Sequence, residues 1–200
     1  MRLAICPGIH DPKLTEGFLG SLSLEWGVET EIKAKISNPE SRISTPVRVF
    51  PAQDYPAYSA VDILQFLCAQ EPAEESLIFI SFSAGVVGAI GAAWGWQGLG
   101  GEVKAFIALD GWGVPLGGNF PIHRLSHDDF THWSSALLGG GGESFYADPP
   151  VEHLELWRSP QTAKGWRVCK TTNGRETKSP TTAAAFLVNL LTYYGVKSID

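Results

Sequence analysis

Residues 77–85 read Leu-Ile-Phe-Ile-Ser-Phe-Ser-Ala-Gly, and they join a strand, a sharp turn and the start of a helix. The apolar run at 77–80 is typical of a strand that is buried on both faces. The small residues that follow predict a helix over 84–94. A buried strand that leads into a helix is the building unit of a parallel sheet covered by helices. We therefore expect an α/β protein.

The same alternation of strands and helices continues on both sides of this unit. Apolar runs predict further strands at 2–6 and 103–109, and Val47 and Val49, which alternate around Arg48, predict one at 46–50. Further strands are expected at 120–125 and 144–147. Apolar residues at helical spacing predict helices at 12–24, 58–69, 153–166 and 180–194. Pro160 is expected to kink or end part of the helix at 153–166. The last helix is expected to be capped by Ser179, with Pro180 at its first position. The expected fold is a mostly parallel, twisted sheet with helices on both faces, a three-layer sandwich formed as a single domain over residues 1–200. Ligand-binding residues are then expected just after the strands.

The composition excludes several classes of protein. The chain has 200 residues, of which 44% are hydrophobic, so it is not an intrinsically disordered chain. Lys and Arg together number 15 and Asp and Glu 21, which gives a net charge of −6. A general nucleic-acid-binding protein usually carries a basic stripe, so nucleic acid is not an expected partner.

One uncharged stretch, residues 76–101, is long enough to span a bilayer. It is rich in glycine and divides into a β-rich half and a small-residue helical half, so we expect it in the core and predict no membrane span. The cysteines Cys6, Cys68 and Cys169 lie far apart without a metal-binding spacing, which favours reduced thiols in the cytoplasm. The N-terminus reaches Pro7 too early for a signal peptide, which agrees with a cytoplasmic location.

The turn after the strand at 77–80 carries the most informative motif, Ser81-Phe82-Ser83-Ala84-Gly85. It resembles the nucleophile elbow G-x-S-x-G of the α/β-hydrolase family, with Ser81 in place of the first glycine. The short chain leaves little room for a cap domain, so the resemblance is to small, cap-poor members of the serine esterase and lipase type. It implies that Ser83 is a catalytic nucleophile.

A nucleophilic serine needs a histidine base, and the base needs an orienting carboxylate. In the α/β-hydrolase family, the acid follows the serine in the chain and the histidine comes last. His153 follows the last expected parallel strand and is the predicted base. Asp128 follows the expected strand at 120–125 and is the predicted orienting acid, with Asp129 as its neighbour.

Other residues compete for these two roles. Asp110 follows the strand at 103–109, a position that some members of the family use for the acid. A triad of Ser83 and Asp110 with either His127 or His132 is therefore an alternative. His127, Asp128 and His132 together do not form a convincing zinc site, because no further ligand lies nearby in the sequence, so no metal is predicted.

The resemblance also implies an oxyanion hole. One donor would be the backbone N–H of Ala84, directly after the nucleophile. The second would come from the early loop Cys6-Pro7-Gly8-Ile9, where Ile9 is the predicted donor. His10 follows in the same loop and could instead hold the loop in place.

These residues together predict a serine hydrolase that acts on a carboxylic ester or similar small-molecule acyl substrate. Two alternatives remain at this point: a non-catalytic binding or scaffold protein with the same fold, and an acyltransferase that uses the same site. The sequence has no dinucleotide fingerprint and no phosphate-binding loop, so no cofactor is predicted.

Overall fold

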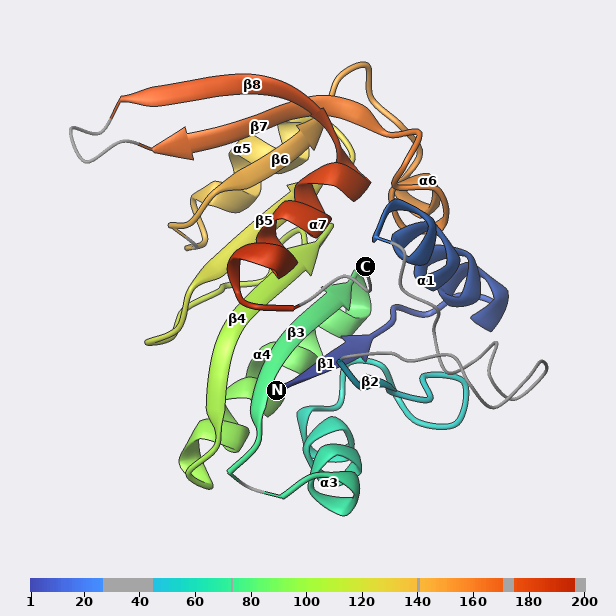
Figure 1. The fold of residues 1–200 in the computed structure, drawn as a ribbon, viewed down its shortest axis with the longest axis vertical. Coiled ribbons are helices and arrows are strands. Elements are labelled where there is room, and N and C mark those ends of the chain that lie inside the picture. Colours follow the sequence, from blue (N-terminus) through green and yellow to red (C-terminus); the bar gives the residue numbers. More distant parts are fainter. Residues whose placement is uncertain (27–44, 73, 140, 171–174, 197–200) are drawn as a thin grey trace.

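The computed structural model describes residues 1–26, 45–72, 74–139, 141–170 and 175–196. Within these residues the chain forms an eight-stranded sheet in the order β2-β1-β3-β4-β5-β6-β7-β8 (Figure 1). The strands are β1 (Arg2–Cys6), β2 (Val47–Val49), β3 (Ser76–Phe82), β4 (Glu102–Leu109), β5 (Ile122–Ser126), β6 (Ser144–Ala147), β7 (Lys164–Lys170) and β8 (Glu176–Thr182).

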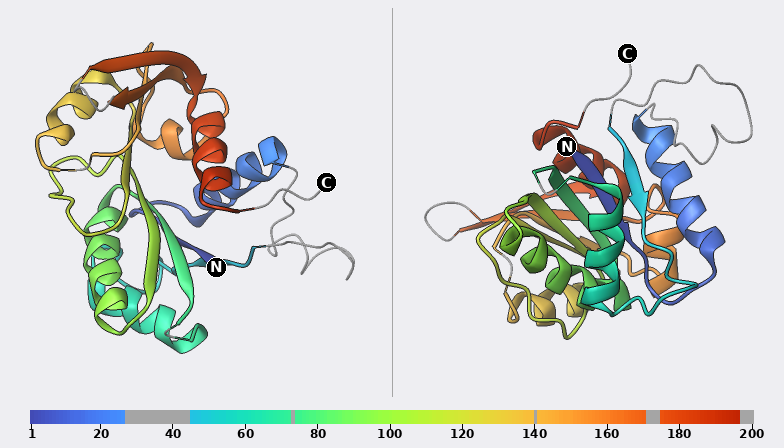
Figure 2. Two further views of the ribbon diagram at one scale, coloured as in Figure 1. Left: turned by 60° about the vertical axis from the view of Figure 1, so that its left-hand side comes forward. Right: turned by 90° about the horizontal axis from the view of Figure 1, so that it is seen from below.

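Neighbouring strands from β2 to β6 are parallel, whereas β7 and β8 pair antiparallel at one edge. The described helices are α1 (Pro12–Trp26), α3 (Ala60–Gln70), α4 (Ala84–Gly98), α5 (Asp129–Ala136), α6 (His153–Arg158) and α7 (Ala183–Tyr193). Figure 2 shows α1, α6 and α7 on one face of the sheet and α3, α4 and α5 on the other. The predicted α/β fold with a mostly parallel sheet between helices is confirmed.

The central strand β3 shows why the sheet is buried on both sides. Leu77 and Phe79 point into the core beneath α3 and α4, and Ile78, Ile80 and Phe82 point into the core beneath α1, α6 and α7. All five side chains are buried. A strand between two apolar layers reads as a continuous apolar run, and this is the pattern that predicted it.

The uncharged stretch at 76–101 divides as expected into β3 and α4. In the part of the chain that the structure describes, no helix has the length and apolar character needed to cross a membrane.

The helix expected over 153–166 is much shorter than predicted. Helix α6 ends at Arg158, and β7 begins at Lys164. Pro160 lies between them; its ring is incompatible with a helix interior, and its carbonyl accepts the N–H of Ala184 from the start of α7.

The start of the last helix is also corrected. Ser179 and Pro180 lie within β8, and Thr182 is the N-cap of α7, where its hydroxyl accepts the N–H of Ala185 at 3.1 Å. Proline is tolerated here because β8 is the edge strand of the sheet. A Ser-Pro pair favours a helix start and an edge strand alike, so the cap assignment shifted by three residues.

Candidate functional site

A pocket opens at the carboxyl ends of the central strands. Its walls combine five polar residues from separate elements with apolar side chains. It is lined by Ser83, Ala84, Val87, Asp110, Trp112, Val114, His127, Thr131 and His153. Parallel sheets bring the residues after their strands to one edge, so this is where a functional site was expected.

Ser83 forms the turn between β3 and α4 in an unusual backbone conformation. Its φ of 53° and ψ of −124° place it in a region that L-amino acids rarely adopt. The turn is held by a hydrogen bond from the Ser83 N–H to the Leu109 carbonyl at 3.0 Å. Strain of this kind persists only where the surrounding structure enforces it, and it concentrates at functional sites.

Ser81 and Gly85, the small residues two positions before and after Ser83, are each explained by a different contact. A Cβ at Gly85 would overlap the carbonyl oxygens of Cys6 and Pro7, so only glycine lets the early loop approach the turn. Ser81 stands where the resemblance would place a glycine. Its buried hydroxyl donates to the Ile107 carbonyl at 3.2 Å, so the substitution is accommodated within the sheet.

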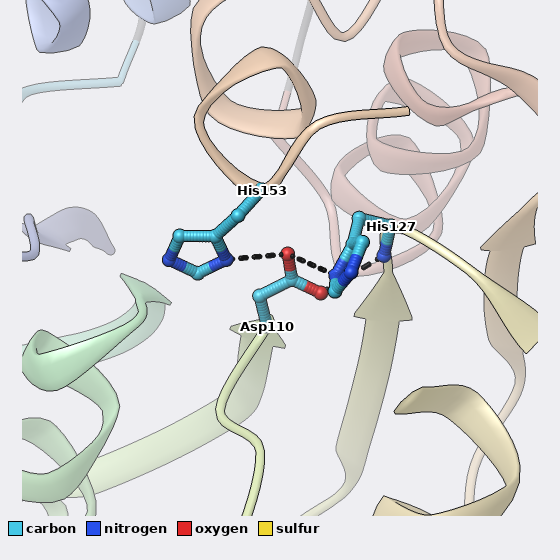
Figure 3. A group of neighbouring side chains, drawn as sticks. All are labelled: Asp110, His127 and His153. Atoms are coloured by element: carbon cyan, nitrogen blue, oxygen red, sulfur yellow. Dashed lines mark hydrogen bonds and ion pairs between the residues drawn. The ribbon is translucent and has the colours of Figure 1, made fainter. Parts of the chain in front are cut away.

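A chain of hydrogen bonds connects Ser83 to a histidine and a carboxylate. The Nε2 atom of His153 lies 3.0 Å from the Ser83 Oγ. Its Nδ1 atom lies 2.8 Å from Oδ2 of Asp110 (Figure 3). The His153 ring stacks on Phe82 with 4.7 Å between the ring centroids, which fixes the plane of the imidazole.

The carboxylate beside His153 is Asp110 and not Asp128, which corrects the preferred assignment and favours the alternative one. Asp128 is the N-cap of α5 and accepts the N–H of Thr131 at 2.6 Å. Burial alone would raise the pKa of the Asp128 carboxyl, but its bonds to Thr131 and the neighbouring His127 bring that pKa below its usual value. The Asp128 side chain therefore caps the start of α5 and does not contact His153.

His127 and His132, the alternative bases, lie in different surroundings. His127 contacts the same Asp110 carboxylate as His153 does: its Nδ1 lies 2.9 Å from Oδ2, and its backbone N–H donates to Oδ1 at 2.9 Å. His132 instead pairs through Nε2 with the Ser144 hydroxyl, and burial lowers the pKa of its imidazole. The imidazole hydrogen-bonded to Ser83 is that of His153.

Asp110, His127 and His153 also bring three potential metal-ligating atoms within 4.8 Å of one another. The nitrogen–oxygen distances of 2.8 Å and 2.9 Å are those of hydrogen bonds. Ligands arranged tetrahedrally around a zinc ion at about 2.0–2.1 Å would stand roughly 3.3 Å apart. The spacing therefore fits a hydrogen-bonded cluster better than a metal centre.

Ala84 and the loop that carries Ile9, the residues predicted to supply the oxyanion donors, both adjoin Ser83. Ala84 is the first residue of α4, and the first amides of a helix have no acceptor within the helix. A Cβ placed on Gly8 would lie 2.9 Å from the Ser83 Cβ, so the peptide that joins Gly8 to the exposed Ile9 adjoins the nucleophile position. His10 packs its ring near Phe82 and bonds to the Asp11 carbonyl, which is a role in holding the loop.

Comparison with known proteins identifies no family: no protein-family model matches the chain, and no curated protein is similar to it. The fold class and the geometry of the site therefore carry the functional argument.

Proposed function

We propose that the protein is a serine hydrolase that cleaves a carboxylic ester or a similar acyl substrate through an acyl-enzyme on Ser83. The observation that carries this proposal is the hydrogen-bonded chain from the Ser83 Oγ through His153 to the buried Asp110 carboxylate, built on a strained strand-to-helix turn. An ordinary helix cap would require neither the strained backbone nor the histidine.

In the acylation half of the reaction, the Ser83 Oγ attacks the acyl carbon while its proton passes to Nε2 of His153. The carbonyl oxygen gains the negative charge, and the N–H groups of Ala84 and Ile9 would stabilise it. Asp110 holds the Nδ1 proton of His153 and stabilises the imidazolium that forms. The intermediate then collapses, and the leaving alcohol takes the Nε2 proton.

In the deacylation half, His153 removes a proton from water as the water oxygen attacks the ester carbonyl on Ser83. The second tetrahedral intermediate uses the same two amides. Its collapse returns the proton to the Ser83 Oγ and releases a carboxylic acid. No cofactor enters this sequence of steps.

The walls of the pocket support an apolar substrate group. Val87, Trp112 and Val114 line it beside Ser83, and the Trp112 side chain is largely exposed. Asp110 is the carboxylate of the lining, and its side chain is buried against the two histidines. Such walls favour an uncharged acyl or alcohol group.

The test is covalent labelling with a fluorophosphonate probe, followed by mass spectrometry of the labelled peptide. We expect wild-type protein to be labelled at Ser83 and the Ser83→Ala variant to remain unlabelled. Ser81→Ala is the matched control, because it removes a hydroxyl two residues before Ser83, at the end of β3, and should leave labelling intact. The proposal fails if folded wild-type protein is not labelled.

Labelling alone does not distinguish hydrolysis from acyl transfer. A p-nitrophenyl ester assay with and without an added alcohol separates them, since a hydrolase releases free acid in both cases. Accumulation of the new ester would identify an acyltransferase that uses the same residues. A folded protein that neither reacts with the probe nor hydrolyses esters would instead be a binding protein with this fold.

A further inference from the structure

The Asp110 carboxylate is shared by two histidines, although a serine triad requires one. Its side chain is 1% exposed, so its acceptors are turned away from water. Oδ1 accepts the backbone N–H of His127, and Oδ2 lies within hydrogen-bonding distance of both imidazoles (Figure 3). His127 thus contacts the carboxylate through both its backbone N–H and its imidazole ring.

The backbone of His127 also connects to the segment that carries His153. The His127 carbonyl accepts the N–H of Val151 at 3.0 Å, two residues before His153. His127, directly after β5, therefore binds both the acid that follows β4 and the loop that leads to the base at the start of α6. Displacing His127 would disturb the distance between Asp110 and His153 from both sides.

The hydrogen bonds also define where the protons lie. An ionised carboxylate can only accept, so both Nδ1 atoms must carry a proton when they bond to Asp110. His153 then presents a free lone pair on Nε2 to Ser83, as a general base must. His127 has its own Nε2 atom 3.6 Å from Oδ2 of Asp128, where a second proton would be attracted.

Four titratable groups face His127: Asp110 after β4, Asp128 at the start of α5, and Glu152 and His153 at the start of α6. The hydrogen bond to Asp110 raises the pKa of His127 despite the opposing effect of burial, and the two other carboxylates add to the rise. The His127 and His153 rings lie 6.0 Å apart. A charged His127 would therefore repel the imidazolium that forms at His153 during acyl transfer.

We propose that His127 is a positioning residue that holds Asp110 against His153, and that a second proton on His127 lowers the catalytic efficiency of the site. This inference rests on the proposed hydrolase function. With neutral His127, the Asp110 charge is available to the His153 cation. With protonated His127, the same carboxylate is shared between two cations, and the base becomes weaker.

The test measures kcat/KM for a p-nitrophenyl ester between about pH 5 and about pH 9. His127→Asn keeps an N–H donor near the Nδ1 position but cannot titrate. His127→Leu removes both the donor and the titration. His132→Asn is the matched control, because His132 bonds to Ser144 and not to Asp110.

The acid side of the wild-type profile should require two protonation steps, the first reducing kcat/KM by roughly 3- to 10-fold. His127→Asn should retain wild-type kcat/KM at alkaline pH within about 3-fold and titrate in one step. His127→Leu should lose roughly 10- to 100-fold at all pH values, because a hydrogen bond to a charged group is lost. His132→Asn should keep both wild-type steps. The inference is overturned if His127→Leu retains the wild-type rate, or if His127→Asn keeps two steps.

Nuclear magnetic resonance of protein labelled with nitrogen-15 in histidine provides a readout without a substrate. Protonation of His127 should displace the His153 Nδ1 and Nε2 signals in wild-type protein, and this displacement should vanish in His127→Asn but persist in His132→Asn. If the His153 signals do not move while His127 titrates, the proposed coupling between the two histidines is contradicted. A folded protein with coupled signals but no labelling of Ser83 would refute only the hydrolase function.

Discussion

The turns after β4 and β5 each carry an aspartate, yet the two carboxylates serve different purposes. Asp110 has a φ of 49°, a side chain that is 1% exposed, and histidines as its partners. Asp128 has an extended backbone, a side chain that is 27% exposed, and a backbone amide of its own helix as its partner. A carboxylate that caps a helix finds its donor locally, whereas Asp110 depends on residues from other elements.

This difference shows that the place of an acid after a strand does not define its role. The left-handed backbone at Asp110 turns the carboxylate into the protein, where its neighbours are His127, directly after β5, and His153, at the start of α6. Asp128 directly precedes α5, and its carboxylate accepts a backbone N–H from the first turn of that helix. Single substitutions in these two turns test whether the two carboxylates have different roles.

The largest expected effect is that of Asp110→Asn. Asparagine tolerates the left-handed backbone, but its amide cannot hold the Nδ1 protons of both histidines as a carboxylate does. We expect kcat to fall by roughly 10⁴-fold, the scale seen when a triad acid becomes an amide. Asp128→Asn is the matched control and should stay within about 3-fold of wild type, because asparagine is also a good N-cap. Similar losses in both variants would remove the distinction between the two turns.

Gly111→Ala should have the next largest effect, through packing of the turn after β4. A Cβ at Gly111 would lie 2.6 Å from the Cγ1 of the buried Val86 in α4. Overpacking of this kind should lower the free energy of unfolding by about 1–3 kcal/mol, measured by urea denaturation. Gly117→Ala is the control, since a Cβ there has nothing within 4 Å. Equal stability of the two variants would show that the turn after β4 can shift to accommodate the added methyl group.

The smallest effect is expected for Asp128→Ala, which removes the cap of α5. It should lower the free energy of unfolding at neutral pH by about 1 kcal/mol and leave the rate of ester hydrolysis nearly unchanged. The pKa of the Asp128 carboxyl is lowered in the folded protein, so its contribution is present above the ordinary pKa of an aspartate and is lost as pH falls through the folded pKa. The difference from wild type should therefore shrink in acid. Asp129→Ala, at an exposed neighbouring position, is the control.

Most of the sheet could be predicted because its strands are buried on both faces. The run at 77–80 is continuously apolar, the run at 103–109 is apolar except for Lys104, and both became central strands. The ribbon of β7 and β8 was missed because neither strand is a continuous apolar run. β7 mixes buried, half-buried and exposed positions, and β8 (Glu176–Thr182), at the edge of the sheet, is polar and mostly exposed. Such strands depend on hydrogen bonding to an adjacent strand. The spacing of apolar residues along one segment does not reveal which other segment it pairs with.

The position of a residue around the pocket could be predicted where the backbone fixes its side chain, and not where tertiary contacts choose between similar residues. Ser83 follows from its strand-turn-helix context, and His153 from its place after the last parallel strand. Asp110 and Asp128 are equivalent in the sequence, since both follow strands. The choice between them depends on the left-handed turn at Asp110 and on the loop that brings His153 to it, which are features of the folded chain.

The close contact of Gly85 with the carbonyls of Cys6 and Pro7 has a consequence for folding. It joins parts of the chain that are far apart in sequence, and His153 must come from still further along. Long-range contacts of this kind form only after the entropy of closing the intervening loops has been overcome. The pocket therefore exists only once β1, β3, β4 and α6 have come together, and a truncated chain that lacks any of them cannot carry it. Reactivity at Ser83 would then report that these elements have assembled.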